Sequence, residues 1–475
     1  MGGVRPALVR FDADVLVVGL GCAGAAAAFE AAAAGARVIA LEAAGGPGGS
    51  SALSGGEVYL GGGTDLQHAC GVEDDTEQMF RYLHQALGPH PDDAKLRLYC
   101  EGSPEHYRWL VERGVPFKPS LYQGVSWLPP TEDGLMWLGE NAWPFTETAV
   151  PAPRGHRPAT PGSGGQLLME CLVASARGVG VEVHTDTRAR GLVTDASGAV
   201  VGVRARRFGE ELSYHAPAVV LSTGGFADEE SMVADHVPAL VGHRRVSDGR
   251  DDGSGIRLGL SVGGTVRRMS ATQIALSVVP ALACHGMIVN ARGERFVNED
   301  VYPGRFSQIA VLHQPGPWFT VVDEQGWEAV PEAERWGVQP LAVSEDVAEL
   351  EVAAGFPAGS LAATLARYGA DAAAGADRVH HKDPRWLRPL RAPYAVIDAT
   401  AGFGGSGPGG ASGFTLGGLR TDLDGAVLDA QERPIQGLYA AGRAASGIHG
   451  AGYVSGTSLG DGTFFGRRAG RAATR

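Results

Sequence analysis

The chain has 475 residues and a formal net charge of −13 at pH 7. An acidic chain lacks the excess of cations that binding to a phosphate backbone requires, so nucleic acid is not expected as a partner. Only three of its basic residues are lysines and no basic run occurs, which excludes a membrane-binding basic patch. Glycine is unusually abundant, with 71 residues, about twice the roughly 7% of an average protein.

The first 42 residues predict a strand, a tight turn, a helix and a second strand. Residues 14–18 (DVLVV) are nearly all apolar, as in a strand of a parallel sheet that is buried on both faces. An alanine-rich helix is predicted at 24–34, and a strand at 37–41 ends next to Glu42. The first strand and the helix are joined by residues 19–24, which read G-L-G-C-A-G.

The remaining chain divides by composition. One helix and then three strands are predicted at 166–178, 181–186, 199–205 and 218–222. Residues 271–395 are richer in Trp, Pro and Glu, and the glycine-rich pattern then returns with a predicted strand at 438–441. We therefore expect one domain built from residues 1–270 and 401–475, with residues 271–400 inserted as a second domain.

Cysteines and hydropathy set the expected environment of the chain. The five cysteines form no C-x-x-C pair and no metal-like cluster, so a reduced, cytoplasmic setting is expected and no metal site is predicted. The apolar run 13–41 is interrupted by charged residues, and no other stretch approaches about 18 apolar residues, so no transmembrane segment is expected. The glycine cluster 402–413 is interpreted as a flexible or cofactor-adjacent connection.

The G-x-G-x-x-G pattern predicts a dinucleotide site because of its context. It follows a predicted strand, opens a helix and has an acidic residue, Glu42, 18 positions after Gly24. Gly19 permits the tight turn, Gly21 lets the backbone approach a pyrophosphate, and Gly24 lets helix and strand pack closely. Amides at the helix start would face the phosphates, while Glu42 would accept hydrogen bonds from a ribose. The pattern alone does not distinguish FAD from NAD.

Further motifs follow in an order known from one superfamily. They are 45–56 (GGPGGSSALSGG), 223–225 (TGG), 252–259 (DGSGIRLG), 289–299 (VNARGERFVNE) and 437–443 (GLYAAGR). With these motifs the chain resembles the fumarate reductase and succinate dehydrogenase flavoproteins from about residue 12 to its end. The resemblance implies an α/β fold with a Rossmann-like, doubly wound FAD-binding domain, an inserted α+β cap domain and a site between the two.

The same resemblance implies which residues hold FAD. Covalently flavinylated members carry a histidine at the position of Gly49, so FAD is expected to be bound non-covalently. Arg443 stands where many members have an acid that contacts FAD, which leaves its role open. The last helix is expected to open at 458–460 (SLG), with its positive end toward the flavin. The expected cofactor-binding residues are Gly19, Gly21, Cys22, Ala23, Gly24, Glu42, Ala43, Ser50, Ser51, Gly55, Gly56, Thr223, Gly224, Gly225, Asp252, Gly442, Arg443, Ser458 and Leu459.

Three departures from the family pattern indicate a different substrate. Members that act on fumarate or succinate hold the dicarboxylate with arginines and histidines, because anionic groups need charge-assisted hydrogen bonds. The matching positions here are Pro303, Phe414 and Tyr453. A pocket changed in this way is expected to bind a small hydrophobic ketone and to bind succinate poorly.

Two segments narrow the resemblance to the 3-ketosteroid dehydrogenases, and within them to the Δ4-(5α) type. They are 298–305 (NEDVYPGR) and 452–470 (GYVSGTSLGDGTFFGRRAG). The resemblance implies that Tyr302, Tyr453 and Ser455 line the flavin as the catalytic residues. Residues 330–390 match no motif, so substrate specificity can differ there.

The chemistry of a ketone desaturation suits these three residues. It removes a proton from the α carbon and a hydride from the β carbon, and a donor is needed where the enolate oxygen develops. If 453–455 is extended, Tyr453 and Ser455 point to one face. Our hypothesis is that Tyr453 donates to the carbonyl while Ser455 and Tyr302 handle the proton. The alternatives are that both tyrosines only pack against the flavin and that Ser455 is an ordinary turn residue; His449 is interpreted as structural rather than as a base.

The expected function is therefore an FAD-dependent desaturation beside a ketone of a hydrophobic polycyclic molecule, at carbons 4 and 5 of a 3-ketosteroid. Alternatives are Δ1-desaturation of the same ring, or reduction of such a bond in another metabolite, as in a fumarate reductase. A flavoprotein that uses FAD structurally and a non-redox hydratase also remain open. An electron acceptor is expected, and the sequence does not identify it.

Overall fold

The computed structural model describes residues 9–400 and 411–475. Its central sheet has the strand order β22-β23-β12-β2-β3-β8, and all neighbours are parallel except β22, which is antiparallel to β23. The strands are β2 (Val15–Val18), β3 (Val38–Leu41), β8 (Glu182–His184), β12 (Ala218–Leu221), β22 (Ala426–Leu428) and β23 (Pro434–Ala440). The predicted strand, helix and strand at the N-terminus are therefore present as β2, α1 (Cys22–Ala33) and β3.

The central strands are buried on both faces, as their continuous apolar sequences indicate. Val15 and Val17 pack with α1, whereas Leu16 and Val18 pack on the opposite face with the second, mixed sheet described below. Helices α6 (Gly165–Gly178) and α14 (Thr457–Ala472) lie beside α1 on the first face.

Glycines let α1 and α14 approach closely. A Cβ on Gly466 or Gly470 would overlap the backbone of Ala23 or Ala27 in α1. Alanine on one helix and glycine on the other therefore bring the two backbones together. This packing fixes the start of both helices, which reach the same cavity.

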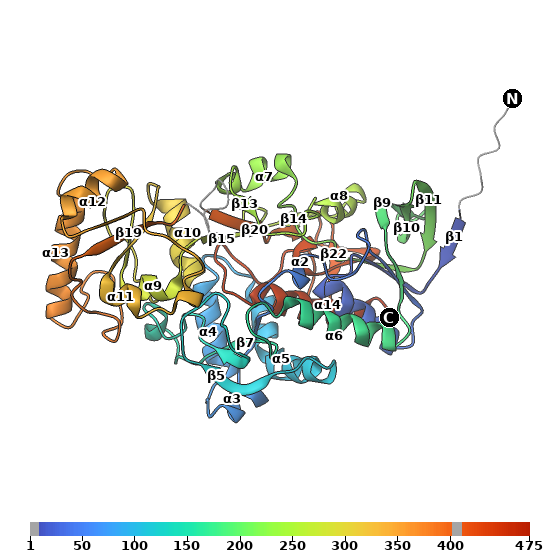
Figure 1. The fold of residues 1–475 in the computed structure, drawn as a ribbon. Coiled ribbons are helices and arrows are strands. Elements are labelled where there is room, and N and C mark those ends of the chain that lie inside the picture. Colours follow the sequence, from blue (N-terminus) through green and yellow to red (C-terminus); the bar gives the residue numbers. More distant parts are fainter. Residues whose placement is uncertain (1–8, 401–410) are drawn as a thin grey trace.

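A second sheet covers the other face of the central sheet, in the order β1-β11-β10-β9. Its strands are β1 (Val9–Asp12), β9 (Thr187–Thr194), β10 (Val200–Arg207) and β11 (Glu210–His215). The predicted strand at 199–205 is β10, whereas β9 and β11 were not predicted. In Figure 1 this sheet lies at one end of the molecule.

A separate body lies at the opposite end of the molecule in Figure 1. Its antiparallel sheet has the order β16-β17-β19-β18, and five helices surround it. The strands are β16 (Met287–Val289), β17 (Phe319–Asp323), β18 (Ala342–Ser344) and β19 (Tyr394–Asp398). The helices are α9 (Pro280–His285), α10 (Pro303–His313), α11 (Glu324–Glu328), α12 (Val347–Ala354) and α13 (Ser360–Ala373). We call this body the cap.

The cap is connected to the rest of the chain through two paired strands. β15 (Thr272–Leu276) leads into the cap, β20 (Ala411–Thr415) follows it in the chain, and the two are antiparallel neighbours. All strands of the cap sheet lie inside the predicted insertion 271–400, and the domain boundaries themselves remain a prediction. Most of the glycine cluster 402–413 lies outside the described residues.

The remaining elements lie along the lower side of the molecule in Figure 1, where α3, α4 and α5 are labelled, and along its upper side, where α7, α8 and β13 are labelled. A small sheet has the order β4-β7-β6-β5, and β14 pairs with β21. The elements are α2 (Gly49–Ala52), β4 (Val58–Tyr59), α3 (Asp65–Ala69), α4 (Thr76–Ala86), α5 (Asp93–Glu112), β5 (Lys118–Tyr122), β6 (Asp133–Met136), β7 (Gly155–His156), α7 (Glu230–His236), β13 (Arg244–Arg245), α8 (Ser254–Ser261), β14 (Val266–Arg267) and β21 (Gly418–Leu419), with short 3-10 turns at Phe145–Glu147, Pro238–Leu240, Glu332–Glu334 and Gly442–Ala444.

Candidate active site

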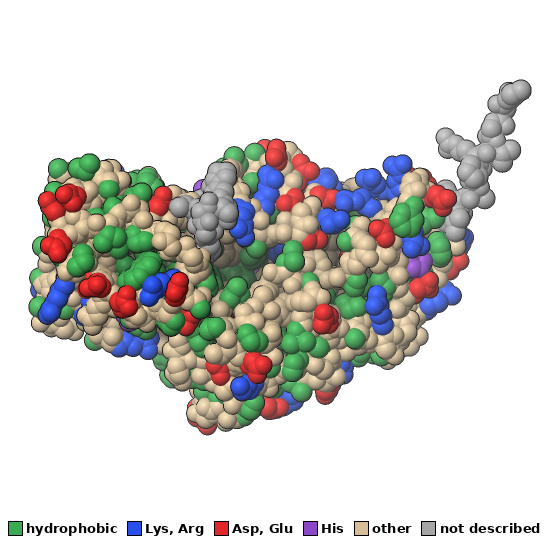
Figure 2. All heavy atoms as spheres, in the orientation of Figure 1, with side chains coloured by type: hydrophobic (Ala, Val, Ile, Leu, Met, Phe, Trp, Pro, Cys, Tyr) green, Lys and Arg blue, Asp and Glu red, His purple; other side chains and the backbone are tan. Residues whose placement is uncertain are grey.

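A large cavity of about 750 Å³ runs from the carboxyl ends of β2, β3 and β12 to the strand pair that leads to the cap. Figure 2 shows the surface hollowed next to the cap, with hydrophobic side chains inside the hollow. Sixteen predicted cofactor residues line the large cavity: Gly19, Gly21, Cys22, Ala23, Glu42, Ala43, Ser50, Ser51, Gly55, Thr223, Gly224, Asp252, Gly442, Arg443, Ser458 and Leu459. The other three, Gly24, Gly56 and Gly225, do not line it.

The glycine turn forms a narrow cradle at one end of the large cavity. Gly19 has φ +93°, and a Cβ there would lie 2.6 Å from the carbonyl oxygen of Ser222. A Cβ on Gly24 would overlap the carbonyl oxygen of Gly19, so Gly24 serves packing. The nearest atom to a Cβ on Gly21 is Ser51 Oγ at 3.4 Å, so a side chain there would occupy cavity space instead. These positions fit the roles predicted for the three glycines.

Polar groups in the cradle fit a dinucleotide. Gly21, the N-cap residue of α1, has no side chain to cap the helix, and Ser51 Oγ accepts the N–H of Cys22 at 3.2 Å. The amides that follow Cys22 in the first turn are the ones that suit an anion. Glu42 accepts from the N–H groups of Leu20 at 2.9 Å and Ala44 at 2.7 Å, which orients its carboxylate. Burial raises the pKa of Glu42, and the two amides oppose that shift. Thr223 Oγ1 is buried without a hydrogen-bond partner among the described residues.

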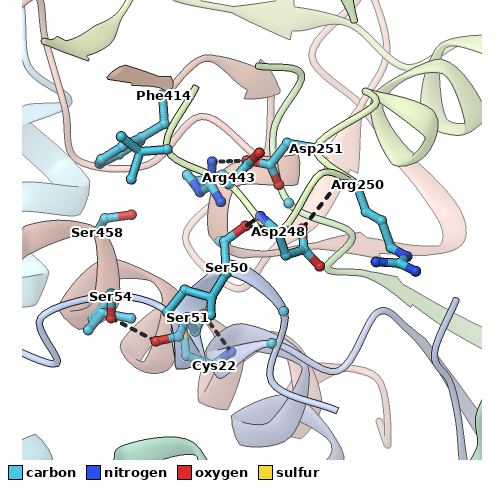
Figure 3. A pocket seen from close by; sticks show the side chains of 18 of the residues that line it. Cys22, Ser50, Ser51, Ser54, Asp248, Arg250, Asp251, Phe414, Arg443 and Ser458 are labelled. Atoms are coloured by element: carbon cyan, nitrogen blue, oxygen red, sulfur yellow. Dashed lines mark hydrogen bonds and ion pairs between the residues drawn. The ribbon is translucent and has the colours of Figure 1, made fainter. Parts of the chain in front are cut away.

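Arg443 takes part in a buried ion pair within the cavity wall. Its guanidinium pairs with Asp251, and both side chains are largely buried (Figure 3). The guanidinium also lies 5.2 Å from the ring centre of Phe414. The sequence left the role of Arg443 open. In the structure its side chain forms part of the cavity wall beside Phe414, and Asp251 neutralises its charge. The predicted residue Asp252 lies nearby, where its carboxylate binds Arg188 at 2.5 Å.

The three predicted catalytic residues meet where the cap joins the body. The hydroxyls of Tyr302 and Ser455 are 3.0 Å apart, although 153 positions separate them in the chain. Tyr453 and Ser455 line the large cavity, whereas Tyr302 lines a small adjoining cavity of about 80 Å³. Ser455 lines both cavities. The segment 453–455 is not a strand, but both side chains reach the large cavity as predicted for an extended segment.

Apolar groups surround the two tyrosines. Tyr453 contacts Phe414 edge-on with ring centres 5.4 Å apart, and Tyr302 contacts Trp127 edge-on at 6.2 Å. Ala271 and Leu416 belong to the same buried cluster. Burial raises the pKa of both tyrosines well above the usual value, so both hydroxyls stay protonated at neutral pH.

The structure also places the other residues that the sequence analysis named. The predicted last helix, α14, begins at Thr457, and Ser458 and Leu459 in its first turn line the large cavity. Pro303 occupies the first turn of α10, directly after Tyr302. His449 does not line the large cavity; it bonds Thr457 Oγ1 at 3.0 Å, and burial lowers its pKa to about 3.

Among the lining residues that sequence reasoning did not identify are Glu57, Trp127 and Gln273. Glu57 directly follows the matched glycine motif. The signal that could have identified it is a charged residue at the start of an apolar strand. Trp127 and Gln273 carry no motif signal, because only the fold places them at the cavity.

Comparison with known families identifies the cofactor. The family profile described as FAD binding domain matches residues 14–459. The chain belongs to this FAD-binding family. The flavoprotein is accordingly an FAD-dependent oxidoreductase with the predicted doubly wound fold. Non-covalent attachment of FAD stays a prediction.

The flavoprotein is similar to proteins of known structure and activity. A 3-ketosteroid-Δ4-(5α)-dehydrogenase from Rhodococcus jostii RHA1, determined in complex with 4-androstene-3,17-dione, is 45% identical, with 99% of this chain and 98% of that chain covered and a TM-score of 0.94. A 3-oxo-5-alpha-steroid 4-dehydrogenase from Comamonas testosteroni is 29% identical over 65% of this chain and 67% of its own length. A fumarate reductase (cytochrome) from Shewanella frigidimarina is 28% identical over 97% of this chain and 77% of its own length.

The described part of the flavoprotein, residues 9–400 and 411–475, contains no helix that is both long enough and apolar enough to cross a membrane.

Proposed function

We propose that the flavoprotein desaturates a saturated 3-ketosteroid between carbons 4 and 5. The observation that carries this proposal is the Tyr302–Ser455 hydrogen bond beside Tyr453, at the apolar end of the large cavity. The similarity to a Δ4-(5α)-dehydrogenase over nearly the whole of both chains supports the position of the new double bond. The expected partners are a small, steroid-like ketone and an electron acceptor that stays unidentified.

FAD would lie along the cradle that the glycine turn, Glu42 and the start of α14 form. The amides of α1 would face the pyrophosphate, and Glu42 would accept from the ribose hydroxyls. Bound FAD supplies the hydride acceptor, and the protein supplies position and electrostatics. Ser458 and Leu459 lie in the first turn of α14, whose positive end would favour a negative charge on the neighbouring ring.

Tyr453 would donate a hydrogen bond to the ketone oxygen of the substrate. Its raised pKa keeps the hydroxyl protonated, so it can donate while negative charge develops on that oxygen. Ser455 would receive the α proton, since its hydroxyl lines the large cavity and is bonded to Tyr302. Neither hydroxyl is a strong base, so the proton must pass on through Tyr302.

The side chains around the apolar end of the large cavity disfavour a dicarboxylate substrate. Pro303, Phe414 and Tyr453 stand where charged or protonatable residues hold fumarate in the resembled enzymes. Arg443, beside Phe414, is already paired with Asp251. An anionic substrate would therefore lose its hydration at this end of the cavity without gaining an opposite charge, which is unfavourable.

An anaerobic titration tests the proposal. We expect the oxidised flavin absorbance to bleach when a 5α-reduced 3-ketosteroid is added, and mass and NMR analysis to place the double bond between carbons 4 and 5. A double bond between carbons 1 and 2 would instead support the Δ1 alternative. An unchanged flavin spectrum across a panel of saturated 3-ketosteroids would overturn the proposal, and reduction of fumarate by the reduced protein would point to a reductase.

A further inference from the structure

The small cavity joins the presumed site of proton removal to the protein surface. Its inner wall contains the buried Tyr302 and Ser455, and its outer wall contains the exposed Gln123, Gly124 and Arg385. Its volume of about 80 Å³ is several times the roughly 10–15 Å³ that one water requires. Its lining mixes apolar and polar side chains, and the polar ones, which include Glu57, Asn141, Tyr302 and Ser455, give water molecules groups to bond.

Glu57 is the residue that joins the two cavities. It lines both of them, as Ser455 and Trp127 also do. The chain at Glu57 runs along Gly456: the next two residues form β4, and the N–H of Tyr59 donates to the carbonyl of Gly456 at 3.0 Å. The backbone at Glu57 therefore lies beside the segment that carries Ser455, and the side chain of Glu57 reaches both cavities from there.

The carboxylate of Glu57 is buried and incompletely satisfied. The residue is 7% exposed, and its Oε1 has no hydrogen-bond partner among the described residues. Such an atom is unfavourable unless water or a proton satisfies it. Burial raises the pKa of Glu57, so the group takes up a proton more readily than an exposed glutamate.

Arg157 limits that shift and keeps the carboxylate ready to accept. Its Nε lies 4.0 Å from Glu57 Oε1, too far for a hydrogen bond. Its other two nitrogens donate to five backbone carbonyls, those of Pro129, Thr131, Asp133, Thr160 and Gly162, which hold the guanidinium in place. The fixed positive charge lowers the pKa of Glu57 and so opposes part of the rise that burial causes.

The other charged groups of this region are already engaged. Asp300, in the small cavity, accepts from Asn298 at 3.1 Å and from the N–H of Asp383 at 2.9 Å. Arg385 pairs with Asp383 at 3.5 Å. Of the groups that line both cavities, only Glu57 can be a carboxylate base. Its charge also raises the pKa of Tyr302 and Tyr453, which keeps both hydroxyls protonated.

We propose that Glu57 is the terminal proton acceptor of the relay and that the small cavity is the path by which the proton reaches solvent. This inference rests on the proposed function. The α C–H bond of the ketone breaks, and its electron pair forms the new C=C bond as the β C–H bond breaks and the β carbon loses a hydride, for which bound FAD would be the acceptor. The proton goes to Ser455 Oγ, the former serine proton goes to the Tyr302 oxygen, and the former tyrosine proton passes through water in the small cavity to Glu57. Glu57 then releases a proton to solvent, and all three groups return to their starting state.

The test compares Glu57→Gln with the wild type by anaerobic stopped-flow reduction with a saturated 3-ketosteroid at a series of pH values. The wild-type rate should fall on the acid side, because a protonated Glu57 cannot accept. In Glu57→Gln the rate at neutral pH should fall by about a hundredfold, the lower end of what a positioned proton-transfer group contributes. The fall of the rate toward low pH, which we call the acid limb, should also disappear in this variant. Glu57→Asp should restore the limb and part of the rate, since it restores a carboxylate.

A second measurement does not depend on turnover. Infrared titration of the oxidised protein should show a carboxyl band that grows as the pH falls and that is missing in Glu57→Gln. Glu140→Gln is the matched control, because Glu140 is also buried with an unpartnered Oε1 but lines neither cavity. It should leave the pH profile of the rate unchanged.

The outcomes separate the two proposals. Flavin content and steroid affinity are measured for each variant to establish that the site is intact. An active wild type whose acid limb persists in Glu57→Gln overturns the role of Glu57 and leaves the proposed function standing. A wild type that no saturated 3-ketosteroid reduces overturns the proposed function itself.

Discussion

Tyr302 and Tyr453 differ in what their hydroxyls can reach, although both are buried. Tyr453 lines the large cavity and lies against Phe414, so its hydroxyl suits a direct bond to a ligand oxygen. Tyr302 lies behind Ser455, in the small cavity, so it suits proton transfer rather than ligand contact. We therefore expect two residues of the same type to take different roles because of their positions.

We expect Tyr453→Phe to lower the rate of flavin reduction by about 10²–10³-fold, because it removes one donor to the developing negative charge. Stopped-flow reduction with a saturated 3-ketosteroid measures this rate. Tyr439→Phe is the control: its hydroxyl donates to the carbonyl of Ala472 at 3.3 Å and lies at neither cavity. A Tyr453→Phe protein that turns over at the wild-type rate removes this residue from the mechanism.

The Arg443–Asp251 pair is expected to matter for stability. Arg443→Leu leaves the carboxylate of Asp251 buried without its partner, which should cost about 3–5 kcal/mol of unfolding free energy. Urea unfolding measures the loss. Adding Asp251→Asn to Arg443→Leu should recover part of it. Arg420→Leu, which breaks an exposed pair with Glu432, should cost no more than about 1 kcal/mol. Equal losses for both arginine variants would contradict the argument.

At the scale of elements, the cradle depends on how closely β2, α1 and β12 approach one another. Gly19 turns the chain against Ser222 at the end of β12, and Gly24 packs against the carbonyl of Gly19. The turn is held by backbone contacts on both sides, so neither position has room for a side chain. The placement of the α1 amides follows from this packing.

Gly24→Ala should therefore reduce flavin binding strongly, since its Cβ would overlap backbone that cannot move without opening the turn. The ratio of bound flavin to protein in the purified variant measures the effect. Gly369→Ala, in α13 with no atom within 4 Å of the new Cβ, is the control. It should keep full flavin content and gain roughly 0.5–1 kcal/mol of stability. Normal flavin content in Gly24→Ala would contradict the packing argument.

The sequence predicted those elements whose signals are local. The β2–α1–β3 unit followed from continuous apolar runs and glycine spacing. Strands β9 and β11 were missed because residues 187–194 and 210–215 mix charges with apolar residues, and only pairing with β10 makes them strands.

Features of the candidate site that depend on contacts between distant parts of the chain could likewise not be predicted from the sequence. Tyr302, Tyr453 and Ser455 were named by resemblance, but the 3.0 Å bond between Tyr302 and Ser455 depends on how the cap docks. Glu57 was missed because the motif match ended at Gly56 and its importance comes from lining two cavities. The pairing of Arg443 with Asp251 joins residues 192 positions apart and has no sequence signal.

At the scale of the whole molecule, the large cavity is built from distant parts of the chain. Its wall includes residues from Val18 near the N-terminus to Leu459 in the last helix. A cofactor bound there would bridge elements that otherwise contact one another only in part. A ligand that binds only the folded state raises the free energy of unfolding, by an amount that depends on the ligand concentration and its affinity.

Removing FAD should accordingly lower the stability of the whole protein. Adding FAD back at 100 times its Kd should raise the unfolding free energy by about 2.7 kcal/mol. Urea unfolding of the apoprotein with and without FAD measures this gain. Riboflavin, which lacks the adenosine diphosphate half, should bind more weakly because it cannot contact the cradle of α1. An apoprotein that FAD does not stabilise would contradict the assignment of the cavity.

The pairing of β15 with β20 bears on how such proteins diversify. Leu276 and Ala411 are Cα partners in this pair, so the two ends of the inserted segment lie one strand spacing apart, roughly 5 Å. A segment with adjacent ends can be lengthened or exchanged without changing the path of the surrounding chain. Relatives can thus acquire new substrates by replacing the cap, and Tyr302 with it, while inheriting the flavin cradle unaltered.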